Sequence, residues 1–150
     1  MAEQREDPWA AFNYRVSITP KQGPNVLGGF SEISGLNTEI TYAEYREGTD
    51  AENHVRKVPT ISKMGDVTLK RGLIGSLGIF EWVDQVRRGD QNAEATVVIE
   101  LFSEDHSTAV ATWTLSGARP SKWTGPSLSA KSTDVAMEEL VLVCEKIVYS

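Results

Sequence analysis

The segment that most constrains the fold runs from Met64 to Gly89, because its hydrophobic period changes once along its length. Val67 and Leu69 alternate with polar residues, which indicates a strand with one apolar face. Further on, the apolar residues follow the spacing of one helix face and are Ile79, Trp82, Val83 and Val86. Ser76 is a candidate N-cap, and Gly89 is a candidate residue for ending the helix. We therefore expect one helix that lies on a β-rich body.

Alternation of apolar and polar residues predicts most of the remaining strands. The stretches that show it, some with glycine interruptions, are residues 12–19, 26–36, 38–45, 95–102 and 109–115. The stretch 95–102 has apolar side chains on both faces, which is typical of a strand in the middle of a sheet. Residues 117–126 contain two prolines and indicate an edge strand followed by a turn, because proline cannot donate to a ladder.

The C-terminal segment, residues 132–148, fits two structures. Residues 132–138 have the order of a capping box, which favours the start of a helix. The β-branched residues Val141, Val143 and Ile147 favour a strand instead. These residues alone leave both possibilities open.

The segment from Arg46 to Pro59 is polar and charged, and it has no apolar face of its own. Connections of this length inside a compact domain are uncommon unless they are functional or disordered. One interpretation is a solvated loop. The other is an arm that becomes ordered against a neighbouring subunit through side chains of both charge signs. Its candidate interface residues are Arg46, Glu47, Asp50, Glu52, Asn53, His54, Arg56 and Lys57.

The chain of 150 residues is expected to form a single domain, residues 1–150, preceded by a loose arm over residues 1–10. No apolar run approaches the roughly 20 residues that cross a bilayer. The N-terminus is charged where a signal peptide would be apolar, and a lone Cys144 cannot form an internal disulfide. We therefore expect synthesis in a reducing cytoplasm. A net charge of -6 and a pI near 5.0 argue against specific nucleic-acid binding.

Catalytic chemistry is not indicated by any combination of residues. His54 and His106 fall in expected loops and have no orienting partner in the sequence pattern. Cys144 lies among apolar residues and is expected to be a small buried side chain. Glu138 and Glu139 are adjacent, so on a strand they would point to opposite faces. We expect no enzyme, no metal site and no cofactor.

The order of motifs along the chain resembles a known family. The motifs lie at residues 12–16, 29–36, 45–48, 57–59, 67–72, 82, 113–120, 125–128 and 135–138. In combination they resemble the tail tube proteins of contractile phages and of phage-tail-like contractile injection systems, over residues 12–148. The resemblance implies a mainly β fold, a β-barrel-like sandwich with one flanking helix, and it favours a strand at the C-terminus.

The resemblance also implies a structural function. Subunits of this family join into hexameric rings, which stack into a hollow tube that sheath contraction drives through a target envelope. The implied partners are further copies of the chain, a sheath protein, baseplate and tube-initiator proteins, and DNA or protein cargo in the lumen. The segment 46–59 corresponds to an extended loop that reaches the adjoining ring. The particle would assemble in the cytoplasm and become a virion or a released or anchored injection machine.

Acidic side chains that face the bore would repel DNA and acidic cargo. The candidates for this position are Glu39, Glu44, Glu94 and Glu100. Two alternatives remain open: a tube-initiator or baseplate paralogue that forms a single ring, and a monomeric β-barrel that binds a small ligand in an apolar pocket. The sequence does not distinguish a DNA-passing phage from a toxin-delivering system.

Overall fold

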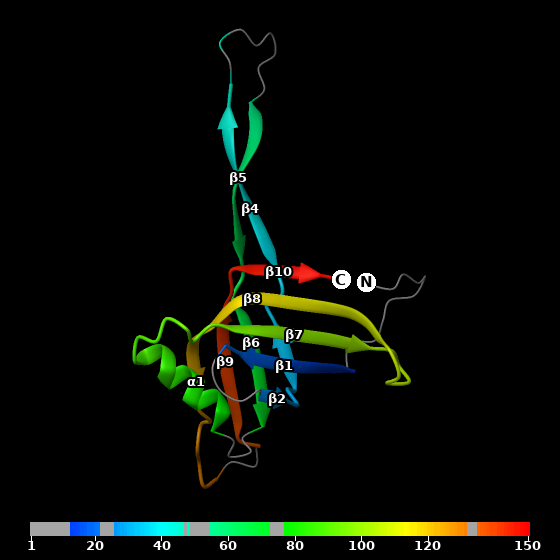
Figure 1. Ribbon diagram of the computed structural model, residues 1–150, viewed down its shortest axis with the longest axis vertical. Coiled ribbons are helices and arrows are strands. Elements are labelled where there is room, and N and C mark those ends of the chain that lie inside the picture. Colours follow the sequence, from blue (N-terminus) through cyan, green and yellow to red (C-terminus); the bar gives the residue numbers. More distant parts are fainter. Residues whose placement is uncertain (1–12, 22–25, 47, 49–54, 73–76, 132–134) are drawn as a thin grey trace.

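The computed structural model describes residues 13–21, 26–46, 48, 55–72, 77–131 and 135–150 (Figure 1). This part of the chain contains strands and one helix. They are β1 (Tyr14–Pro20), β2 (Val26–Gly28), β3 (Glu32–Ser34), β4 (Thr38–Tyr45), β5 (Arg56–Met64), β6 (Val67–Gly72), α1 (Gly78–Arg87), β7 (Ala95–Phe102), β8 (Ala109–Thr124), β9 (Met137–Val143) and β10 (Lys146–Tyr149). No helix in these ranges has the length and hydropathy that a membrane span requires.

The body of the molecule is an antiparallel sheet that folds over into two layers. Its strand order is β2-β1-β7-β8-β9-β6-β3, and β10 pairs with β8. β7 lies between β1 and β8, so the prediction that residues 95–102 form a central strand is confirmed. β8 is 16 residues long and serves both layers: its first part pairs with β7 and β10, and residues 119–124 pair with β9.

The core lies between the two layers and follows the alternation of the strands. The side chains that are almost fully buried include Val16, Ile18, Val67, Leu69, Val97, Ile99, Leu115, Leu140 and Leu142. Burial of each such side chain contributes about 1.5–3 kcal/mol. Helix α1 closes one flank through Ile79 and Trp82, and the Trp82 indole Nε1 donates a hydrogen bond to the Ala93 carbonyl at 2.6 Å.

Helix α1 confirms the helix that the change of period predicts. It begins at Gly78, and Leu77 occupies the N-cap position without a side-chain hydrogen bond. Ser76, the expected N-cap, lies outside the described residues. At the other end, Gly89 has a φ of 81°, as expected for the glycine that ends a helix.

The C-terminal segment is β-structure in its described part, as the resemblance favoured, and the capping-box pattern does not start a helix there. β9 and β10 both run antiparallel to β8, with a kink between them at Cys144 and Glu145. Gly117 lies opposite this kink with a φ of 64°, and a Cβ there would come within 2.8 Å of the Glu145 side chain. Cys144 is only half-buried, contrary to expectation, and burial raises the pKa of its thiol.

The segment 46–59 is not a solvated loop over its whole length, which was one of the two interpretations of the sequence. Arg56–Pro59 belong to β5, which pairs with β4 from Tyr45↔Arg56 to Thr38↔Met64. β4 and β5 form a separate two-stranded ribbon that extends well away from the body (Figure 1). We call these two strands the projecting hairpin.

Candidate assembly surfaces

The projecting hairpin exposes apolar side chains that a sheet would ordinarily bury. Every residue of β4 is exposed, and in β5 only Met64 is half-buried. Ile40, Tyr42, Val58 and Ile61 are each 46–58% exposed. An isolated two-stranded ribbon is at best marginally stable in water, and a contiguous exposed apolar surface marks a site of interaction.

The register of the hairpin places apolar groups on both of its faces. Residues that lie directly opposite each other share a face, so Tyr42 lies beside Pro59, and Ala43 lies beside Val58 on the other face. The register shifts between Thr41 and Tyr42, where β5 carries an extra residue. A surface that covered only one face would leave the other in contact with water.

Each face of the hairpin also carries an oppositely charged cross-strand pair. Glu44 lies opposite Lys57, and Glu39 lies opposite Lys63 on the other face. Of the predicted arm residues, Arg46, Arg56 and Lys57 are described and exposed. The other predicted arm residues, Glu47, Asp50, Glu52, Asn53 and His54, lie outside the described residues.

The four candidate bore carboxylates do not come together on one surface of the subunit. Glu39 and Glu44 lie on the hairpin, on opposite faces of β4, whereas Glu94 and Glu100 lie on the body. Each of the two body carboxylates has a cationic partner.

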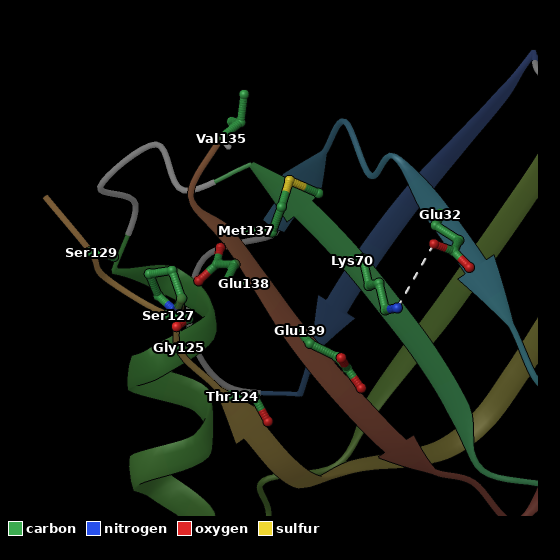
Figure 2. Close-up of a pocket in the computed structure, with 11 residues that line it drawn as sticks. Glu32, Lys70, Thr124, Gly125, Ser127, Ser129, Val135, Met137, Glu138 and Glu139 are labelled. Carbon is green, nitrogen blue, oxygen red and sulfur yellow. Dashed lines mark ion pairs between the residues drawn. The ribbon is translucent and has the colours of Figure 1, made fainter. Parts of the chain in front are cut away.

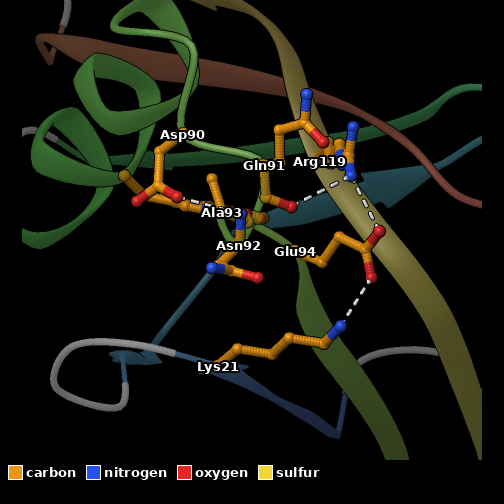
Figure 3. Close-up of polar contacts among 8 residues, drawn as sticks. Lys21, Asp90, Gln91, Asn92, Ala93, Glu94 and Arg119 are labelled. Atoms are coloured by element: carbon orange, nitrogen blue, oxygen red, sulfur yellow. Dashed lines mark hydrogen bonds and ion pairs between the residues drawn. The ribbon is translucent and has the colours of Figure 1, made fainter.

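Glu94 sits between two cations (Figure 3). Lys21 Nζ lies 3.1 Å from Glu94 Oε2, and Arg119 Nη2 donates to Glu94 Oε1 at 2.7 Å. Arg119 also donates to the Gln91 carbonyl at 3.4 Å. The hydrogen bonds from Lys21 and then from Arg119 hold the pKa of Glu94 below its ordinary value. Its negative charge is therefore locally compensated.

Glu100 is compensated in the same way from the neighbouring strand. Arg15 lies directly opposite Glu100 in the β1–β7 ladder, and Arg15 Nη2 donates to Glu100 Oε1 at 3.3 Å. The guanidinium also lies over the Phe102 ring, 5.1 Å from its centroid. The sequence pattern did not indicate these partners, because Arg15 and Glu100 are 85 positions apart.

A second surface lies where β9 begins, beside the segment 124–129 (Figure 2). It contains a cavity of about 640 Å³ whose lining includes Glu32, Lys70 and Glu139. Lys70 and Glu32 lie on neighbouring strands, with Lys70 Nζ 3.9 Å from Glu32 Oε2. The rim carries Val135, which is 76% exposed.

Glu138 and Glu139 point to opposite faces of β9, as expected from their adjacency. Glu138 is buried and accepts hydrogen bonds from Arg71 Nε and from Trp123 Nε1, the latter at 3.2 Å. Arg71 is 2% exposed and lies over the Phe30 ring. Sequence reasoning missed this buried ion pair, since its members are 67 positions apart.

Metal-binding groupings of side chains are absent from the described residues. No three His, Cys, Asp or Glu side chains within them come together in a way that would hold a metal ion. His106 is exposed in the turn before β8, with a φ of 61°. On the described surface, the projecting hairpin and the cavity beside β9 are the candidate interaction sites.

Solved structures with this fold include chains of contractile injection system complexes. A chain of the PVC sheath–tube complex of an extracellular contractile injection system, in its extended state, superposes with a TM-score of 0.82 and 26% identity, covering 97% of this chain and 93% of that chain. A chain of the anti-feeding prophage (AFP) baseplate matches with a TM-score of 0.82 and 26% identity, covering 97% of each chain. Hcp1 from Flavobacterium johnsoniae shares the fold, with a TM-score of 0.52, 15% identity and coverage of 91% and 94%. No match was found among curated proteins.

The fold and its exposed hairpin thus define a class, the structural tube subunits of contractile injection machines. Within this class the chain belongs to the T4-like virus tail tube protein gp19 family, whose family model matches residues 10–148. Its role is structural, in the inner tube. The family resemblance seen in the sequence is confirmed, and a monomeric ligand-binding barrel is set aside.

Proposed function

We propose that the chain is the main subunit of the tube, and that its copies close into hexameric rings that stack into a hollow, rigid tube. The observation that carries this proposal is the projecting hairpin, whose apolar side chains are exposed on both faces of the isolated subunit. Such a ribbon becomes stable in water when other surfaces cover it. A tube built from identical copies supplies those surfaces to every subunit.

Ring closure is supported by the open edges of the body sheet. In the described part of the chain the strand order ends at β2 and β3, and β10 pairs with β8 alone. Unpaired strand edges promote association, and a closed ring of copies removes them. A ring of six matches the 6-fold symmetry applied to the similar AFP baseplate.

The proposed partners follow those of the similar structures. The tube would lie inside a contractile sheath and join a baseplate and tube-initiator proteins, with DNA or a protein effector as cargo in the lumen. Sheath contraction would supply the energy, so the subunit itself requires no nucleotide, metal or cofactor and acts without catalysis. Assembly would take place in the cytoplasm, and the product would be a virion or an injection particle.

Residues 1–150 would form one tail-tube domain, with arm 1–10 at the N-terminus and the inter-ring arm 46–59 at the end of the projecting hairpin. The proposed contact residues of this arm are Arg46, Glu47, Asp50, Glu52, Asn53, His54, Arg56 and Lys57. Glu39, Glu44, Glu94 and Glu100 remain candidates for the bore. Because Glu94 and Glu100 have cationic partners, these two would repel acidic cargo less than free carboxylates.

Negative-stain electron microscopy of the purified chain tests the proposal over a range of concentrations, with and without tube ends from its own particle as a template. Rings or hollow tubes are the expected result. A monomer at every concentration, even with the template present, would contradict the proposal.

Deleting residues 49–56 tests the inter-ring arm. We expect a folded subunit that still forms rings but does not stack, because the deletion shortens the end of the hairpin without touching the core. Circular dichroism and electron microscopy would report the fold and the assembly. Tubes of normal length from this variant would show that the arm does not join the rings.

A second candidate function is a tube-initiator or baseplate subunit that forms one ring. The match to a chain of the AFP baseplate supports this second candidate function. The same electron microscopy distinguishes the two, since an initiator would yield single rings at concentrations at which a main tube subunit yields long tubes.

A further inference from the structure

We infer that a groove between α1 and β8 receives residues 1–9 of a neighbouring copy of this chain, with Trp9 as the apolar anchor. We call it the α1–β8 groove, and its lining comes from residues 83, 86 and 87 of α1 and 120–123 of β8. The inference rests on the proposed function, because it names a contact that would fasten one subunit of a ring to the next. The family model begins to match at residue 10, so residues 1–9 lie outside the region that the family model describes.

The floor of the α1–β8 groove is apolar. The apolar face of α1 is wider than the core beneath it, because Ile79 and Trp82 are buried whereas Val83 is only partly buried. On the opposite wall Trp123 is also only partly buried, and the Phe80 ring meets it edge-on with centroids 5.5 Å apart. A ligand that covered these side chains would remove further apolar area from water.

The rim of the groove is cationic. Among the described residues that line it, Arg87 and Lys122 carry charge and no acid is present. Asp84 pairs closely with Arg88, with Nη2 2.6 Å from Oδ2, and only loosely with Arg87, whose Nη1 lies 3.9 Å from Oδ1. No ion pair to another described residue engages Lys122. The groove therefore favours a segment that combines acids with a large apolar side chain.

Residues 1–9 have this composition. They contain three acids and one cation, which are Glu3, Glu6, Asp7 and Arg5. Trp9 follows the acids directly after Pro8, and proline favours an extended backbone at the residue before it. Tryptophan is among the residues most enriched at the energetic centres of interfaces. The segment thus offers both features that the groove favours.

The volume of the groove fits one anchor side chain. At about 270 Å³ it falls just below the roughly 300–1,000 Å³ of pockets that enclose drug-sized ligands. It can therefore take up an indole ring, while the preceding acids lie along the cationic rim.

The layout of the body favours a neighbouring copy over the same subunit. β1 begins at Tyr14, opposite Leu101 near the end of β7, on the side of the body away from α1 (Figure 1). The five steps from Trp9 to Tyr14 span at most about 18 Å. β1 alone, with seven residues, covers about 20 Å from that side toward α1. Trp9 therefore falls short of its own groove, and a contact between opposite sides of two copies is one that can close into a ring.

Photochemical cross-linking in assembled tubes tests this contact. Trp9 is replaced by the photoreactive p-benzoylphenylalanine, and tubes are grown on a template from an equal mixture of 15N-labelled and unlabelled chains. Mass spectrometry is expected to find mixed-isotope cross-links from position 9 to residues 83–87 or 120–123. The same probe at Thr96, which pairs with Thr19 at the far end of β1, is the control and is expected to give no mixed-isotope cross-links to those residues.

Cross-links from position 9 that map elsewhere, or that join only chains of the same isotope, would overturn the inference and leave the proposed function standing. Failure of the unsubstituted chain to form rings or tubes with a template would overturn the proposed function as well. Electron microscopy of the same samples distinguishes the two failures.

Reversal of charge gives an independent readout. Lys122→Glu is expected to raise the chain concentration required for half-maximal assembly about tenfold, because it places a carboxylate beside the acids of the arriving segment. Glu6→Lys in the same chain is expected to restore most of the loss. Lys131→Glu reverses an exposed lysine outside the groove and is the matched control, with no change expected. Unchanged assembly of Lys122→Glu, or no rescue by Glu6→Lys, would contradict the inference.

Discussion

Strand β1 of the body and strand β4 of the projecting hairpin both alternate apolar and polar residues, yet their apolar side chains lie in opposite environments. In the body, Val16 and Ile18 of β1 are almost completely buried. In the hairpin, Ile40 and Tyr42 of β4 are about half exposed at 50% and 53%. The apolar side chains of the body stabilise the subunit, whereas those of the hairpin are available to stabilise an assembly.

The largest loss of subunit stability is expected from Glu138→Ala in the body. Arg71 would then be buried without a counter-charge, which costs about 3–5 kcal/mol in the free energy of unfolding. Urea denaturation of the unassembled subunit measures this loss. The matched control is Glu139→Ala, which removes the adjacent, outward carboxylate and should change the free energy of unfolding by less than about 0.5 kcal/mol. Equal losses in the two variants would contradict the assigned burial.

A pair of alanine variants, one in the core and one on the hairpin, measures this difference between the two regions. Leu140→Ala in the core is expected to lower the free energy of unfolding by about 2–5 kcal/mol through lost burial and cavity formation. Ile61→Ala on the hairpin should lower it by less than about 0.5 kcal/mol but reduce tube yield. Denaturation curves and sedimentation of assembled material measure the two effects. A large loss of subunit stability in Ile61→Ala would mean that the hairpin stabilises its own subunit.

The smallest effect is expected from Glu94→Gln, and it depends on pH. Lys21 and Arg119 lower the pKa of Glu94 in the folded state, so the carboxylate contributes stability above its ordinary pKa of 4.5. That contribution is lost as the pH falls through the lowered folded-state value. The variant should therefore be less stable than the parent at pH 7, and the difference should shrink in acid. Denaturation at several pH values checks this, and a constant difference would contradict it.

Local patterns in the sequence were sufficient to predict β1, β7 and α1. In each of them the periodicity of apolar residues directly reports which face is buried, as Val97 and Ile99 illustrate. The strand at the C-terminus was not determined in this way, because its β-branched residues and the preceding capping pattern pointed to different structures. Only the family resemblance favoured the strand that the structure contains.

The strand β5 was not predicted from the sequence, and the reason is physical. Val58 and Ile61 lie on one face of the hairpin, because their cross-strand partners Ala43 and Thr41 share that face. They are nevertheless three positions apart in the sequence, since the bulge inserts an extra residue between them. The period of two is lost, and the segment looks like a polar loop. The strand β5 was therefore not predicted, although β4 and the arm 46–59 were.

The partners of Glu94, Glu100 and Glu138 were also beyond the reach of local reasoning. Sequence arguments identify a carboxylate but not the cation that folding brings to it from 25 to 85 positions away. This is why two of the four carboxylates proposed for the bore turn out to be paired.

The long strand β8 has a mechanical consequence. Because it belongs to both layers of the body, a load applied to β9 and β6 reaches β7 and β1 through a continuous peptide backbone and its hydrogen bonds. The layers cannot slide past each other without breaking the ladders on both sides of β8. Each subunit would therefore resist relative movement of its two layers when a load is applied along the tube.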